Sequence, residues 1–150
     1  MAFNAPSLKG RALRLLGQRE HSRAELERKL RPHETTPGEL AQALDDLQSK
    51  GFINEQRVLE SVVFRRAPRL GAQRVRQELL AKGLAPEAIS QAVADLQSTE
   101  VARARDVWRR KFGVVAEDPP TRARQVRFLA SRGFGAEAIR RVVKGPFEED

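Results

Sequence analysis

The fold is decided by two stretches that read almost alike, RQELLAKGLAPEAI at residues 76–89 and VRFLASRGFGAEAI at residues 126–139. In each, a basic residue and a glycine follow an apolar, helix-forming segment, which is the usual way for a helix to end. A second apolar segment begins soon after, so each stretch predicts a helix–glycine–helix corner. At an offset of 50 the two stretches share Leu79/Leu129, Gly83/Gly133, Glu87/Glu137, Ala88/Ala138 and Ile89/Ile139.

A third and more divergent copy of this pattern lies upstream, at an offset of 49. The tetrapeptide DLQS of residues 46–49 recurs unchanged at residues 95–98. Self-similarity at a fixed period is typical of repeat architectures, so three units of roughly fifty residues are predicted to fill the chain. The positions that coincide are Leu26/Val75, Leu30/Leu79, Pro37/Pro86, Leu40/Ile89, Leu44/Val93 and Leu47/Leu96.

Each unit has the pattern of three short helices. Residues 8–18 carry an apolar stripe at helical spacing. Ser22 and Glu25 form a capping box that opens a second helix, and Thr36 with Glu39 predicts another box before the third.

The later units repeat these signals. Gly71 and Thr121 align with Ser22 and are predicted N-caps, and Pro86 opens a helix at a position where its missing N–H is not needed. No segment alternates with period two for long enough to form a strand. We therefore predict an all-α fold of nine short helices in three tandem three-helix repeats. Because small modules bury little surface alone, we expect them to stack into an elongated and curved molecule.

The predicted repeats differ in charge. They cover residues 1–53, 54–97 and 98–145, and an acidic tail follows at residues 146–150. The first two repeats each have a net charge of +2, whereas residues 101–144 carry 12 basic and 4 acidic side chains. Such an excess favours polyanionic partners or acidic protein surfaces.

No chemical centre is recognisable in the sequence. The chain has no cysteine, which excludes disulfides and thiol catalysis, and its two histidines, His21 and His33, lie in no metal-binding spacing. There is no phosphate-binding glycine loop and no nucleophile elbow. No apolar run is long enough to span a membrane or to act as a secretory signal. We expect a cytoplasmic binding protein with no catalytic residue, cofactor or metal.

The candidate binding residues are basic side chains of the second and third repeats. Small and acidic residues open the third helices, at residues 85–88 and 135–138, which argues against insertion into a DNA major groove. Few exposed aromatic residues are expected, which weakens stacking on single-stranded bases. Broad basic faces suit contact with phosphates or with an acidic protein surface. The predicted partner-binding residues are Arg65, Arg66, Arg69, Arg74, Arg76, Arg109, Arg110, Lys111, Arg124, Arg127 and Arg132.

Several motifs, taken in order, resemble the RecX regulators. They are ALRLL at residues 12–16, REHSRAEL at 19–26, GFINEQR at 51–57, RKFG at 110–113 and RFLASRGF at 127–134. The resemblance covers about residues 10–144 and rests on their order rather than on any single motif. The chain departs from the family pattern at Pro68, which interrupts a basic stretch, and at Asn54–Glu55, where Asp-rich residues are common.

The resemblance implies a bacterial cytoplasmic protein that is not an enzyme and that binds the filament of the RecA recombinase on single-stranded DNA. RecX proteins consist of tandem three-helix repeats, lodge in the filament groove and inhibit strand exchange and ATP hydrolysis. We expect a monomer, with weak direct contact to DNA in addition.

Two other functions stay open. A sequence-independent nucleic-acid-binding protein would bind bare DNA tightly and with a strong dependence on salt. A RecX protein would instead bind the assembled filament more tightly than bare DNA. A helix-turn-helix transcription factor would require dimerisation, and no dimerisation helix is evident in the sequence.

Overall fold

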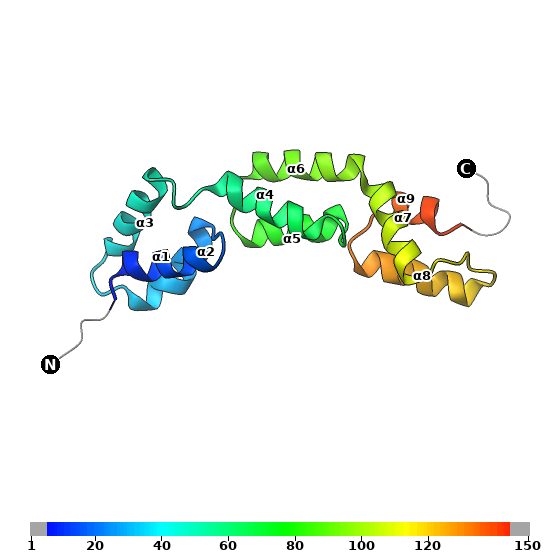
Figure 1. Ribbon diagram of the computed structural model, residues 1–150, viewed down its shortest axis with the longest axis horizontal. Helices are drawn as coiled ribbons and strands as arrows, with labels where there is room; N and C mark the ends of the chain where they lie inside the picture. The colour runs from blue at the N-terminus through cyan, green and yellow to red at the C-terminus, as the bar shows by residue number, and fades with distance from the viewer. Residues whose placement is uncertain (1–5, 145–150) are drawn as a thin grey trace. The chain divides into compact units, whose positions relative to one another are not determined.

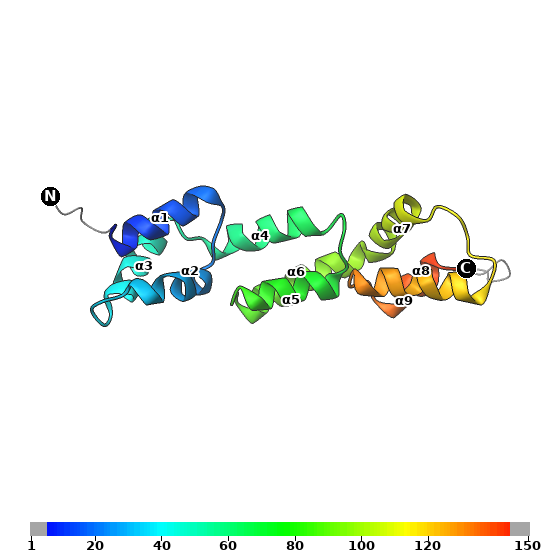
Figure 2. The ribbon, with the colours of Figure 1, turned by 90° about the horizontal axis from the view of Figure 1, so that it is seen from below.

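The structure is a computed structural model that describes residues 6–144, so the predicted acidic tail at residues 146–150 lies outside it. The described residues form α-helices, one 3-10 turn and no strand, which confirms the all-α prediction (Figures 1 and 2). The elements are α1 (Leu8–Gln18), α2 (Arg23–Leu30), η1 (Arg31–His33), α3 (Glu39–Ser49), α4 (Glu55–Arg66), α5 (Ala72–Ala81), α6 (Pro86–Ser98), α7 (Glu100–Lys111), α8 (Pro119–Ser131) and α9 (Ala136–Val142). None of these helices is long and apolar enough to cross a membrane.

The first predicted N-cap is confirmed. The Ser22 hydroxyl accepts a hydrogen bond from the Glu25 N–H at 3.1 Å, and the Glu25 carboxylate accepts one from the Ser22 N–H at 3.0 Å. This reciprocal pair satisfies two of the N–H groups that a helix start leaves without intrahelical partners. Pro86 also opens α6 as predicted.

Two other predicted caps are wrong. Helix α3 does not start at a Thr36 box, because Gly38 adopts a left-handed conformation and the Glu34 carboxylate accepts from the Leu40 N–H at 2.8 Å. Helix α8 starts before Thr121, whose N–H donates to the Asp118 side chain at 2.8 Å. In both cases the carboxylate of an upstream acidic residue, rather than the predicted threonine, accepts the hydrogen bond from an N–H group at the start of the helix.

The chain divides into two compact units. The first comprises the described residues through Ser61 together with Ala81–Leu84, and the second comprises Val62–Leu80 and the described residues from Ala85 on. The helices fall three to each predicted repeat, except that α6 ends one residue past the 54–97 boundary. The repeat boundaries themselves remain predictions.

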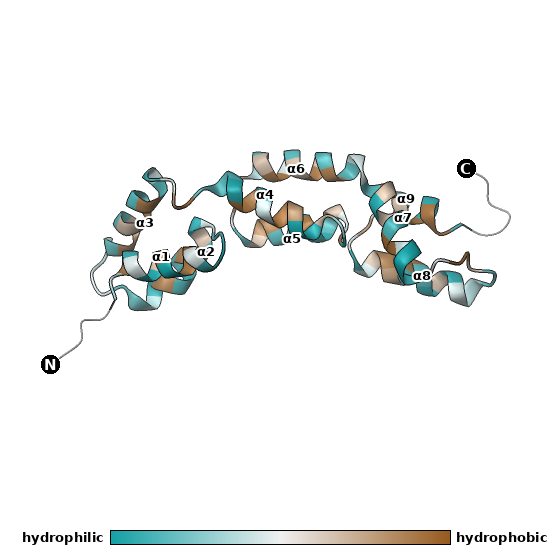
Figure 3. Cartoon of the chain, in the orientation of Figure 1, coloured by the Kyte–Doolittle hydropathy of each residue, from teal (hydrophilic) through white to brown (hydrophobic). Residues whose placement is uncertain are grey.

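Each unit has its own apolar core. Every helix carries both apolar and polar positions (Figure 3), so one face can be buried while the other meets water. The core of the first unit includes the fully buried Leu26, Leu44 and Leu47. In the second unit, Leu129 and Phe134 pack with residues of α7 and α9.

Candidate partner-binding groove

Four of the predicted basic residues converge on one shallow groove of the second unit. It has a volume of about 350 Å³, and of the described residues that line it none is acidic. We call it the cationic groove, and its lining residues are Arg69, Val107, Arg110, Lys111, Phe128 and Arg132. It therefore gathers cations from the α4–α5 turn, from α7 and from the end of α8.

The Phe128 ring lies close to two of these cations. The Lys111 ammonium is 5.2 Å from the ring centroid and the Arg132 guanidinium carbon is 4.9 Å from it. Phe112 meets the same ring edge to face, with centroids 5.5 Å apart. A cation over an aromatic face gains about 0.5–1 kcal/mol at an exposed site. The ring thus holds two positive charges in place without neutralising them.

Arginine side chains hold the turn that carries Arg69. Arg103 donates to the carbonyls of Ala67 at 2.9 Å and Leu70 at 2.6 Å, and Arg110 donates to the Pro68 carbonyl at 2.9 Å. Burial lowers the pKa of Arg103, although the nearby Glu100 carboxylate opposes that shift. Pro68, the departure from the family pattern, therefore lies in an anchored turn.

The same turn is fastened to the corner at Gly133. The Gly71 N–H donates to the Arg132 carbonyl at 2.8 Å, and the Arg74 side chain donates to the Ser131 carbonyl at 2.7 Å. A Cβ added to Gly71 would lie 2.3 Å from the Gly133 carbonyl atoms, so only glycine allows this approach. The corner at Gly133 and the α4–α5 turn together fix the groove.

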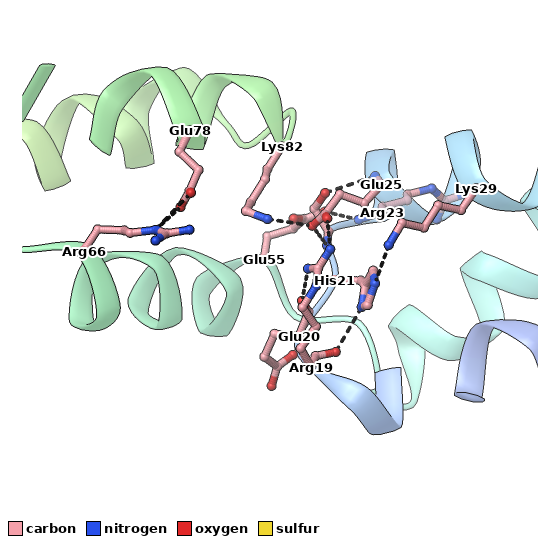
Figure 4. A network of polar contacts seen from close by, with 11 residues as sticks. Arg19, Glu20, His21, Arg23, Glu25, Lys29, Glu55, Arg66, Glu78 and Lys82 are labelled. Carbon is pink, nitrogen blue, oxygen red and sulfur yellow. Dashed lines mark hydrogen bonds and ion pairs between the residues drawn. The ribbon is translucent and has the colours of Figure 1, made fainter. Parts of the chain in front are cut away.

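The structure places the remaining predicted residues outside the groove. Arg66 pairs with Glu78 at 3.1 Å (Figure 4), and the Arg109 guanidinium lies 3.9 Å from Asp106. The Arg74 side chain donates to the Ser131 carbonyl. These contacts occupy part of their donor capacity. The others are exposed at separate places on the helices, namely Arg65, Arg76, Arg124 and Arg127.

Sequence reasoning missed two residues. Phe128 and Arg103 shape the groove, and only the spacing of Phe128 four residues before Arg132, on the same helical face, hinted at a contact. Few aromatic residues were expected to be exposed, and among the described residues the exposed ones are Phe52 at 48% and Phe64 at 83%. The apolar residues of α4 do not gather on a single face, so its sequence alone did not mark Phe64 as exposed.

The first unit neutralises its buried charge. Glu25 is 5% exposed, and it pairs with Arg19 at 2.6 Å and with Lys82 at 3.2 Å (Figure 4). Burial favours the uncharged carboxyl, but the hydrogen bonds from Arg19 and the Ser22 backbone, with Lys82, outweigh it and lower the pKa of Glu25 to about 2. Nearby, burial raises the pKa of Glu55, whose Oε2 is the one buried side-chain oxygen or nitrogen of the described residues without a hydrogen bond.

The described residues offer no metal site. Nowhere in residues 6–144 do three histidine, aspartate or glutamate side chains come close enough together to hold an ion. His21 is buried, and its ring contacts the Arg19 carbonyl and the Lys29 ammonium, both at 3.0 Å. The arrangement as a whole is suited to binding negatively charged groups.

Three family models match the chain in tandem. They describe the first, second and third three-helix domains of RecX and match residues 9–47, 54–93 and 98–143. Together they cover most of the chain, in the order in which the repeats were predicted.

Curated relatives match over nearly the full length. A regulatory protein RecX from Leptothrix cholodnii is 53% identical over 146 residues, which covers 96% of this chain and 93% of the relative. Another protein of that name, from Ralstonia nicotianae, is 46% identical over 139 residues, covering 93% of this chain and 87% of the relative.

Two solved structures share the fold. The crystal structure of RecX from Lactobacillus salivarius superposes with a TM-score of 0.70 at 20% identity and covers 91% of this chain and 92% of its own. A second crystal structure, of a regulatory protein RecX, gives a TM-score of 0.71 at 19% identity, covering 90% of this chain and 70% of its own. At such identities the likeness shows the fold alone.

Proposed function

The chain belongs to the RecX family, and from this premise we propose that it binds the RecA recombinase filament on single-stranded DNA and inhibits its ATPase and strand exchange. The cationic groove is the proposed contact. The observation that supports it is the convergence of four cations, with no acidic lining residue, on one groove.

No ion pair within the described residues neutralises the four cations of the cationic groove. Guanidinium groups donate in a planar fork that suits carboxylates and phosphates, and an ammonium adds a mobile point charge. A nucleoprotein filament offers both kinds of anion. Four cations held close together repel one another, so a partner that brings negative charge relieves this repulsion. Tandem domains add further weak contacts, each strengthened by the tether to the others.

We expect the protein to act by binding alone. Among the described residues, the lining of the groove includes no carboxylate, imidazole or hydroxyl group, and the relatives are named regulatory proteins. A cytoplasmic monomer without a cofactor is the form in which we expect it to meet the filament.

The test reverses the charge of the groove. The triple variant Arg69→Glu, Lys111→Glu and Arg132→Glu should lose inhibition of RecA ATPase by at least tenfold in the concentration required. Arg110 is left intact because it also holds the Pro68 carbonyl. The matched control is Arg109→Glu, Arg124→Glu and Arg127→Glu, which changes the same charge outside the groove. Equal loss in both variants would refute the groove as the contact.

The runner-up is sequence-independent binding to nucleic acid, which the same lining supports. It predicts that the protein binds bare single-stranded DNA as tightly as it binds the filament, with an affinity that falls steeply as salt rises. Parallel binding measurements on bare DNA and on the assembled filament separate the two functions. Preference for the filament supports regulation of RecA, and equal affinity supports the runner-up.

A further inference from the structure

A second basic concavity lies in the first unit, and none of its lining residues is among those that the sequence predicted to bind a partner. It has a volume of about 520 Å³, within the range of about 300–1,000 Å³ that is usual for small-ligand sites. Its polar lining includes Arg11 and Arg14 from α1, Lys29 from α2 and His33 from η1. Of the described residues that line it, none is acidic.

The cations of this concavity are not consumed by internal ion pairs. Within residues 6–144, neither the Arg11 nor the Arg14 side chain has a hydrogen-bond or ion-pair partner. Arg19 and Arg23, on the same unit, pair with Glu25 and Glu27 instead. Glu25 and Glu27 are therefore engaged by Arg19 and Arg23 and not by the cations of the concavity.

Lys29 is held in place by a buried histidine. The His21 Nδ1 lies 3.0 Å from the Arg19 carbonyl, so this nitrogen carries the proton and the opposite Nε2 accepts from the Lys29 ammonium at 3.0 Å (Figure 4). Burial lowers the pKa of His21 and so favours this neutral form. One of the three ammonium protons is occupied in this way, and two remain for a ligand.

The start of α1 adds to the positive field. Ser7 and Gly10 of its first turn line the concavity, and the Ser7 hydroxyl accepts from the Gly10 N–H at 2.9 Å. No acidic side chain stands in that first turn to neutralise the positive end of the helix dipole. Leu15 and Leu30 provide apolar lining beside the cations.

We propose that this concavity binds the phosphate of a nucleotide, with Arg11, Arg14 and Lys29 on the phosphate oxygens and the leucines against the apolar part. The proposal is independent of the cationic groove and of the filament, because it concerns the first unit alone. The same chemistry is present in a free nucleotide and in one unit of a single strand, so the experiment treats these as separate arms.

The test titrates the full chain by calorimetry with ADP in one arm and with a short oligo-dT strand in the other. The variant Arg11→Gln with Arg14→Gln should weaken binding at least tenfold in the arm that holds the true ligand. The matched control, Arg28→Gln with Arg31→Gln, removes two exposed arginines that do not line the concavity and should change affinity less than twofold.

The pattern of lost binding across the two ligands and the variants decides the outcome. Loss confined to ADP assigns a free nucleotide, and loss confined to the strand assigns the nucleotide unit of DNA. Loss in both arms assigns the phosphate that the two ligands share. No binding in either arm, or equal weakening by the two variants, would overturn the proposal. Because Arg14 and Lys29 are exposed, the single variants Arg14→Gln and Lys29→Met keep the test valid if the double variant unfolds.

Discussion

The corner at Gly83 and the corner at Gly133 meet equivalent neighbours in different units. In the first unit, a Cβ on Gly83 would lie 2.8 Å from the Cβ of Ala24, near the start of α2. In the second unit, a Cβ on Gly133 would lie 2.3 Å from the Arg74 side chain, near the start of α5. Ala24 and Arg74 are separated by the same offset of 50 residues as Gly83 and Gly133. The repeat therefore preserves a packing contact, in which a corner glycine meets the first turn of another repeat's second helix.

The basic residues before the two glycines, Lys82 and Arg132, make different contacts. Lys82 meets the buried Glu25 at 3.2 Å, whereas Arg132 lies over Phe128 and has no carboxylate among the described groove residues. Lys82 therefore stabilises the fold by neutralising Glu25, whereas the charge of Arg132 remains available to a partner. The comparison teaches that equal packing can support opposite electrostatic outcomes, and the following variants test it.

The largest effect is expected at the close approach in the second unit. Gly71→Ala places a methyl group 2.3–2.4 Å from backbone atoms of Gly133 and Phe134, which cannot move without opening the corner. We expect a loss of about 3–5 kcal/mol in the free energy of unfolding, measured by urea denaturation. The control Gly17→Ala faces open space inside α1 and should stabilise by about 0.5–1 kcal/mol. Similar stabilities for the two variants would show that the contact is absent.

The next effect concerns the buried carboxylate of the first unit. Glu25→Gln keeps the capping-box acceptor but removes the charge, and about 2–3 kcal/mol of stability should be lost at neutral pH.

The same variant has a signature in pH. Because the pKa of Glu25 is lowered from 4.5 to about 2, its contribution is present above pH 4.5 and lost as pH falls toward 2. The native chain should therefore lose about 3 kcal/mol more than Glu25→Gln across that window, in unfolding curves recorded at successive pH values. Parallel curves would contradict the assignment.

A smaller loss is expected at the first corner. Gly83 has a φ of 70°, and the atom that an added Cβ would meet is a methyl carbon rather than backbone. Gly83→Ala should therefore cost about 1–2 kcal/mol, less than Gly71→Ala. If Gly83→Ala lowers the thermal stability more than Gly71→Ala does, the predicted difference between the two corners is refuted.

The smallest effects compare the corner cations directly. Lys82→Gln leaves Glu25 with only part of its neutralising charge and should cost about 1 kcal/mol, whereas Arg132→Gln removes an exposed cation and should cost less than about 0.5 kcal/mol. Only Arg132→Gln should weaken inhibition of RecA ATPase. Equal stability losses, or equal effects on inhibition, would remove the functional distinction between the corners.

Much of the local structure follows from sequence pattern. The helix at residues 8–18, the Ser22 box and the proline start at Pro86 are confirmed because each depends on neighbouring residues only. The Thr36 and Thr121 caps failed because Glu34 and Asp118 compete for the same N–H groups, and side-chain reach decides that competition.

The candidate site was predictable only in part. Positive charge on the later repeats is visible in the sequence, but eleven cations cannot be ranked without their neighbours. Arg66 is paired with Glu78, while Arg69 and Arg132 meet in one groove although they are far apart in the chain.

The sequence by itself determined the periodicity, the helices and the family motifs, because these rest on short-range preferences and on the spacing of apolar side chains. The tertiary structure decided which charges are neutralised and which remain. That depends on burial and on partners brought together from distant segments, as when Glu25 meets Lys82 or when Phe128 receives both Lys111 and Arg132. Coulomb energy falls with distance in space and not along the chain, so only the fold could decide it.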